Sequence, residues 1–140
     1  MSESLAATLE TFWRAWAKRD KAAALLLMSS DIRFAMHIPQ ETVPFGGETI
    51  GLPAFSDRLQ TILDAFDTLH FQGTVTGVTG HVVRGQVSYA FRHKWTGEIL
   101  EGVMRHVASG GPSRIAVLEE YHDVERIKAF MRLVSHSAAR

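Results

Sequence analysis

Three side chains in the last third of the sequence have the chemistry of proton transfer: His106 in VMRHV, and Glu120 and His122 in EEYHD. Side chains alternate between the two faces of a strand, and this alternation places all three beside apolar neighbours. A carboxylate enclosed among apolar residues loses hydration, so we expect the pKa of Glu120 to rise from about 4.3 toward neutrality, which suits a general acid or base. An imidazole within hydrogen-bond distance could share or relay the proton, and Tyr89, on the same side, could donate to a developing oxyanion.

A structural explanation stands beside each of these roles. Glu120 could pair with His106 or an arginine as a buried structural contact. His122 falls at the rim of the apolar side, so we expect it to contact a ligand rather than to carry the chemistry. Asp123 is better explained as the N-cap of the final helix. A metal site is disfavoured because the histidines come from separate strands and form no H-x-x-x-H helix pair, so we predict no metal and no cofactor.

These side chains belong to residues 81–123, which hold three strand-like runs joined by glycine-bearing turns. The first run has a clear period of two. Neither side of the other two runs is plainly polar, so we expect helices to cover one face of the sheet and a second subunit to cover the other. The apolar side is predicted to bind a ligand through Trp13, Trp16, Phe34, Val87, Phe91, Met104, Leu118 and His122.

Apolar spacings of three and four predict helices over residues 4–18, 21–28 and 53–69, and a final helix from Asp123. Strands are expected over residues 31–38 and 70–79, and a glycine-rich turn before the third helix. Trp13 and Trp16 share one side of the first helix, where core packing is the alternative to stacking on a ligand. The polar side of the third helix, which includes Arg58, is expected to face water. Early helices and late antiparallel strands make the fold class α+β, with a curved sheet wrapped over helices.

The composition narrows the function classes. The chain of 140 residues suits one domain, residues 1–140, with a sizeable core. It has no cysteine, which excludes disulfides and thiolate chemistry and fits a reducing compartment, so we expect a cytoplasmic protein. Its 15 basic residues balance its 15 acidic ones without a basic block, so we predict no nucleic-acid partner. The longest apolar run is too short to cross a membrane, so we predict no membrane partner.

Four segments in order resemble one known superfamily. They are FWRAWAKRDKAAALLLMSSDIRF, the turn PFGGETIGLPAF, the hairpin TGEILEG and the terminal EEYHD. Together they resemble the nuclear transport factor 2-like superfamily, and within it the SnoaL-like polyketide cyclase and ketosteroid isomerase-related group. The resemblance implies a cystatin-like cone, in which a strongly curved antiparallel sheet and helices enclose a hydrophobic pocket. It also implies a homodimer formed through the outer sheet face.

The resemblance also implies site residues. Limonene epoxide hydrolase, a member of the superfamily, activates water with an acidic residue directly before a tyrosine, which matches Glu120, and holds that water near the position of His37 if one bulge residue is allowed. Its catalytic arginine and aspartate would fall at Val87 and Tyr89, so half of that machinery is absent. The isomerase's catalytic aspartate, beside a proline, has no match at Ile38.

SnoaL-type cyclases use an acidic residue and a histidine from late strands, as His106 and Glu120 would supply. We therefore expect a small hydrophobic molecule in the pocket. The expected chemistry is that of a cofactor-free isomerase, cyclase or hydrolase with Glu120, His106, His37 and Tyr89 as its catalytic candidates. The alternative is a non-catalytic ligand-binding or dimerisation module.

Overall fold

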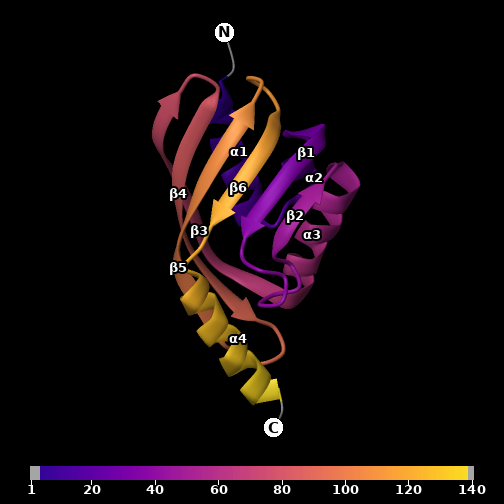
Figure 1. The fold of residues 1–140 in the computed structure, drawn as a ribbon, viewed down its shortest axis with the longest axis vertical. Helices are drawn as coiled ribbons and strands as arrows, with labels where there is room; N and C mark the ends of the chain where they lie inside the picture. The colour runs from indigo at the N-terminus through magenta and orange to yellow at the C-terminus, as the bar shows by residue number, and fades with distance from the viewer. Residues whose placement is uncertain (1–3, 139–140) are drawn as a thin grey trace.

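In the computed structural model, which describes residues 4–138, helices pack against one face of a single six-stranded sheet (Figure 1). The predicted α+β class is confirmed. In chain order the elements are α1 (Leu5–Ala17), α2 (Lys21–Leu25), β1 (Met28–His37), β2 (Gly47–Ile50), α3 (Leu52–Ala65), β3 (Phe66–Thr79), β4 (Val82–His93), β5 (Ile99–Gly110), β6 (Ile115–Tyr121) and α4 (Val124–Ala138).

The strand order is β2-β1-β6-β5-β4-β3, and the sheet remains open at both edges. Most neighbours are antiparallel, but β1 runs parallel to β6, with Met36 opposite Glu120. The expectation of a wholly antiparallel sheet is therefore corrected to a mixed sheet. The physical reason is that β1 and β6 are separated by most of the chain, so no hairpin sets their relative direction. Irregularities in the β3–β4 pairing, such as the one between Thr68 and His70, accompany the bend of the sheet.

Several boundaries differ from the sequence-based expectation. Helix α2 ends at Leu25 rather than at Met28, and β1 begins at Met28 rather than at Asp31. The segment after Gly46, predicted as a turn, forms the short strand β2, which pairs with β1 through Arg33 opposite Ile50. The third helix ends at Ala65 rather than at residue 69, and β3 begins at Phe66. The apolar spacing of residues 66–69 is compatible with a helix or a strand. These residues form a strand because β3 pairs with β4 along its whole length.

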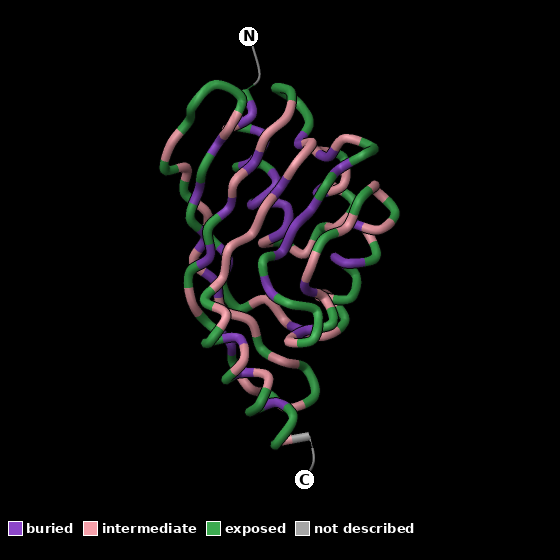
Figure 2. Tube along the Cα trace, viewed as in Figure 1, coloured by how far each residue is buried: buried purple, intermediate pink, exposed green. Residues whose placement is uncertain are grey.

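Helices α1, α2 and α4 begin at side-chain caps, whereas α3 begins after Gly51 without one. The side chain of Asp20 accepts a hydrogen bond from Ala23 N at 3.0 Å, and that of Asp123 accepts one from Arg126 N at 3.2 Å, so the predicted N-cap role of Asp123 is confirmed. Buried residues follow the central strands and the helices beneath them, whereas strand ends and loops are exposed (Figure 2). The helix α4 extends from one end of the sheet (Figure 1).

A slot between two strands holds the indole of Trp13. Gly73 in β3 and Gly85 in β4 lie directly under this ring, and a Cβ atom at either position would overlap it. Glycine in a strand often marks such a close approach. Gly85 pairs across the sheet with His106 in β5, so the indole reaches the imidazole and donates from Nε1 to His106 Nδ1 at 2.9 Å. The slot therefore sets the position of a buried hydrogen bond.

Candidate functional site

An apolar pocket with a cavity volume of about 60 Å³ lies between the inner sheet face, α3, the loop before β2, and α4. Its lining is mostly aliphatic and aromatic, and the side chains that bring polar atoms to it are those of Tyr89, Glu120 and His122, together with the indole of Trp16. Charged or hydrogen-bonding groups in an apolar enclosure are costly unless they pair, so their partners define the chemistry of the site.

The pocket contains about half of the predicted site. The predicted residues that line it are Trp16, Tyr89, Phe91, Met104, Glu120 and His122. Trp13, Phe34, Val87 and Leu118 were expected to contact a ligand but are instead buried outside the lining. Strand alternation placed Phe34, Val87 and Leu118 on the inner face, but α1, which carries Trp13, and α3 fill that part of the bowl, as the contact of Phe34 with Phe55 illustrates.

Several lining residues were not among the predicted site residues. They come from β1, the loop after it, α3, the start of β3, β5 and α4: Met36, Ile38, Val43, Phe45, Ile62, Phe66, Leu100, Ile127, Phe130 and Met131. The apolar side of α4 was recognisable from its periodicity, but periodicity does not say where a helix docks. Polar contacts hold α4 in place: Arg126 donates to the carbonyl of Glu101 at 3.1 Å, and Ser137 donates to Glu98 at 2.8 Å.

Glu120 is held between two imidazoles. Its Oε1 lies 2.8 Å from His122 Nε2, and its Oε2 lies 3.1 Å from His106 Nε2. The contact with His122 is a well-formed hydrogen bond, whereas the His106 N–H is within ion-pair distance but poorly aligned with the oxygen. Register explains the grouping, because His106 pairs directly with Glu120 across β5 and β6, and His122 follows two residues later on the same side. Glu120 and the histidines are thus brought together as predicted.

The predicted direction of the pKa shift of Glu120 is wrong. Burial does raise the pKa of this carboxyl, but hydrogen bonds and electrostatic attraction from His106 and His122 outweigh burial and hold it well below its usual range. Glu120 is therefore ionised at neutral pH. Burial, together with the charge of Glu120, raises the pKa of Tyr89 to about 12, so this side chain stays a phenol that can donate a hydrogen bond.

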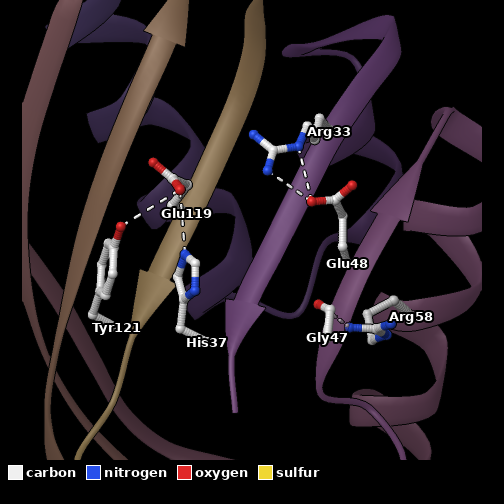
Figure 3. Close-up of polar contacts among 7 residues, drawn as sticks. All are labelled: Arg33, His37, Gly47, Glu48, Arg58, Glu119 and Tyr121. Atoms are coloured by element: carbon white, nitrogen blue, oxygen red, sulfur yellow. Dashed lines mark hydrogen bonds and ion pairs between the residues drawn. The ribbon is translucent and has the colours of Figure 1, made fainter. Parts of the chain in front are cut away.

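Arg58 was expected to face water but is 9% exposed. Its guanidinium donates to the carbonyl of Phe45. It also donates to the carbonyl of Gly47, at 3.3 Å (Figure 3). Burial lowers the pKa of Arg58, while the negative charge of Glu120 raises it. This arginine ties α3 to the loop that forms one pocket wall. Its position on the polar side of α3 gave no sign of this role, which depends on tertiary contacts.

His37 lies on the opposite face of the sheet. Its Nε2 is 3.2 Å from Glu119 Oε1, and its ring stacks on Tyr121 with centroids 4.3 Å apart (Figure 3). An inward His37 required a bulge late in β1, but the register shift lies earlier, between Met28 and Arg33, so alternation turns the imidazole outward. We therefore remove His37 from the candidate catalytic set. Within residues 4–138 no three His, Asp or Glu side chains are grouped so that they could hold a metal ion.

The ionised state of Glu120 makes a prediction about acid stability. Because its pKa is lower in the folded chain than in the unfolded chain, its stabilisation is complete above the ordinary value of about 4.3 and is lost as the pH falls toward the folded-state pKa. We expect the free energy of unfolding of the wild type to fall more steeply below about pH 5 than that of Glu120→Gln. Urea titrations at a series of pH values measure this difference. Glu119→Gln, on the outer face, is the matched control and should keep the steep fall; equal slopes for wild type and Glu120→Gln would contradict the assignment.

Comparisons with known proteins place this geometry in a known fold. No protein-family model and no curated protein matches the sequence. Solved structures do match. One is a Mesorhizobium loti protein provisionally described as a SnoaL-like polyketide cyclase, with 16% identity, a TM-score of 0.68, and 85% of this chain and 99% of that chain covered.

A second is a Catenulispora acidiphila protein with a ketosteroid isomerase-like fold, in complex with trimethylamine, with 15% identity, a TM-score of 0.71, and 89% and 92% covered. A third is a nuclear transport factor 2-like protein from Burkholderia thailandensis, with 18% identity, a TM-score of 0.75, and 89% and 94% covered. The resemblance predicted from sequence is thus confirmed at the level of the fold: this chain has the nuclear transport factor 2-like fold that SnoaL-like and ketosteroid isomerase-like proteins share.

Proposed function

We propose that the protein binds a small hydrophobic molecule in its pocket and moves a proton on it, as a cofactor-free isomerase, cyclase or hydrolase. The observation that carries this proposal is the ionised Glu120 carboxylate beside His122 in the lining of an apolar cavity. A buried charge is expensive to keep, and groups with strongly shifted pKa values cluster at functional sites. The Catenulispora acidiphila neighbour, which is in complex with trimethylamine, supports the small-molecule part of the proposal.

Each polar group in the pocket has a role in this proposal. The pair of Glu120 and His122 exchanges the proton with the substrate. The Tyr89 phenol donates a hydrogen bond to an oxygen on which negative charge develops. The apolar walls exclude water and orient the molecule, which strengthens every electrostatic interaction inside.

A non-catalytic ligand-binding or dimerisation module is the second candidate, because the cavity is small for a substrate. The volume of about 60 Å³ is far below the roughly 300–1,000 Å³ of most ligand pockets. A ligand larger than a few atoms therefore requires a pocket wall to move. We propose α4 as that wall, because it contributes Ile127, Phe130 and Met131 to the lining and lies at the end of the sheet.

We also propose that two copies pair through the outer sheet face. Val103 and Ile99 of β5 are each 53% exposed on or beside that face. Exposed apolar side chains on a sheet face are typical of a surface that contacts another protein. A cytoplasmic location stays a prediction from the sequence. Among the described residues, 4–138, no helix combines the length and the apolarity that crossing a membrane requires.

Substitution of the carboxylate tests the enzymatic proposal. Glu120→Gln keeps the shape of the side chain but removes its charge, so we expect turnover to fall by about 10²- to 10⁴-fold. The assay uses a panel of small hydrophobic ketones, enones and epoxides, with Glu119→Gln as the control that should retain wild-type rates. Undiminished turnover in Glu120→Gln would rule out this carboxylate as part of the chemistry.

Enlarging the pocket tests the binding proposal. Phe130 is 6% exposed and lines the cavity, so Phe130→Ala should open space and tighten the binding of indole, a small apolar probe, at some cost in stability. Leu133→Ala, on the same helix at a residue 47% exposed, is the control and should change neither property. NMR titration with indole measures the affinity. Shift changes outside the pocket residues would contradict the assigned binding site.

The dimer proposal predicts a concentration-dependent assembly. Sedimentation velocity should detect a dimer of the wild type, and Val103→Glu should shift it to the monomer because it places a charge on each side of the proposed interface. Val78→Glu, at a position 58% exposed in β3, is the control and should leave the dimer intact. A wild type that sediments as a monomer at every concentration would overturn the proposal.

A further inference from the structure

One buried nitrogen in the pocket lining lacks a partner among the described residues. His122 Nδ1 is buried and forms no hydrogen bond, although the Nε2 atom of the same ring is bonded to Glu120. Its side chain is 8% exposed and lines the cavity. Buried polar atoms are rarely left unpaired, and those that are require an explanation. A ligand atom that exchanges a proton with Nδ1 would supply one.

The other histidine of the cluster is unable to serve as a proton carrier. The indole Nε1 of Trp13 can only donate, so His106 Nδ1, which accepts its hydrogen bond at 2.9 Å, carries no proton. The single proton of the neutral ring is therefore on Nε2, which faces Glu120 at 3.1 Å. A second proton on Nδ1 would point at the indole N–H and break this bond. Because glycines 73 and 85 hold the indole in its slot, the lone pair of His106 Nδ1 stays engaged by the indole N–H.

In His122, by contrast, no described residue occupies the lone pair of Nδ1. The ionised Glu120 can only accept, so the proton of neutral His122 sits on Nε2, and its Nδ1 keeps a lone pair. A proton taken up at Nδ1 gives an imidazolium ion beside a carboxylate, which stabilises it. Imidazole is the side chain whose charge changes most readily near neutral pH, whereas a carboxylate that accepts two N–H groups is a poor base.

The surroundings of His122 match this role. Glu120 of β6 is the one anion in hydrogen-bond contact with the ring within residues 4–138, and Tyr89 of β4 meets it edge-on, with centroids 6.1 Å apart. His106 of β5 contacts Glu120, and Arg58 of α3 interacts electrostatically with the charge of Glu120. The helix α4 adds apolar side chains to the pocket, and Asp123, next in the chain, caps that helix.

We propose that His122 is the catalytic residue that takes up and returns the substrate proton through Nδ1. Glu120 holds the Nε2 proton, and Trp13 and His106 are positioning residues that keep Glu120 in place and ionised. This inference rests on the proposed function and deepens it. In the step, a C–H bond next to a substrate carbonyl breaks, the proton bonds to Nδ1, and the electron pair stays on the substrate as an enolate. Return of the same proton to another carbon completes an isomerisation.

NMR of the full chain with isotope-labelled histidine tests the proton positions. Signals are assigned by their loss in His106→Gln and His122→Gln. At about pH 8 we expect the Nε2 atom of each ring to carry the proton and the Nδ1 atom to carry none. Trp13→Phe removes the indole donor and Gly85→Ala displaces the ring, so in each variant His106 should lose this fixed proton position. A His106 or a His122 with its proton on Nδ1 overturns the inference.

Turnover separates this inference from the proposed function. On the substrate panel used for Glu120→Gln, His122→Gln should lower turnover by about 10²- to 10⁴-fold and remove the acidic limb of the pH profile. Trp13→Phe should lower turnover less than His122→Gln does, because it loosens the imidazole that contacts Glu120 without removing the proposed base. Turnover that is lost in Glu120→Gln but survives in His122→Gln overturns the inference alone. A wild type that turns over none of the compounds overturns both the inference and the enzymatic proposal.

Discussion

The ionised carboxylate of Glu120, enclosed between two imidazoles, is the interaction on which the rest of the site depends. Burial alone would make this group neutral. The N–H groups of His106 and His122 reverse that preference, with contacts at 3.1 Å and 2.8 Å. The charge in turn decides which atoms of the two rings carry protons. The apolar pocket therefore combines the negative charge of Glu120 with the buried Nδ1 atom of His122, which forms no hydrogen bond within residues 4–138.

The support for the carboxylate extends to the N-terminal helix. Trp13 of α1 reaches His106 because two strands carry glycine where its indole lies, and the register of β4 with β5 brings Gly85 beside His106. A chain of contacts thus runs from α1 through β5 to Glu120 in β6 and to His122 at the pocket. Each member of this chain restricts the proton positions of the next, so the site is preorganised before any ligand enters.

Prediction from the sequence succeeded where local periodicity determines the outcome. Alternation along β4, β5 and β6 placed Tyr89, Met104, His106 and Glu120 on the inner face, and helix periodicity located the apolar side of α4. Prediction failed where contacts between distant elements decide. The parallel pairing of β1 with β6, the burial of Arg58 and the outward direction of His37 all depend on register or tertiary packing.

The direction of the Glu120 pKa shift belongs to the second group. The residue types alone indicated enclosure but not the number of N–H groups that the carboxylate would meet. Trp13 shows the same limit, because it was a candidate for ligand contact and instead donates to a buried imidazole. The glycine at position 85, inside a strand, was a feature of the sequence that indicated the close approach of the Trp13 indole to the backbone.

The most direct test of the account is the ionisation state of Glu120 in the folded chain. The carbon NMR signal of its carboxyl group, assigned through Glu120→Gln, reports that state as the pH is lowered from about 7 to about 4. The account predicts the shift of an ionised carboxylate throughout this range for as long as the chain stays folded. A signal that shows a protonated carboxyl near neutral pH would contradict it.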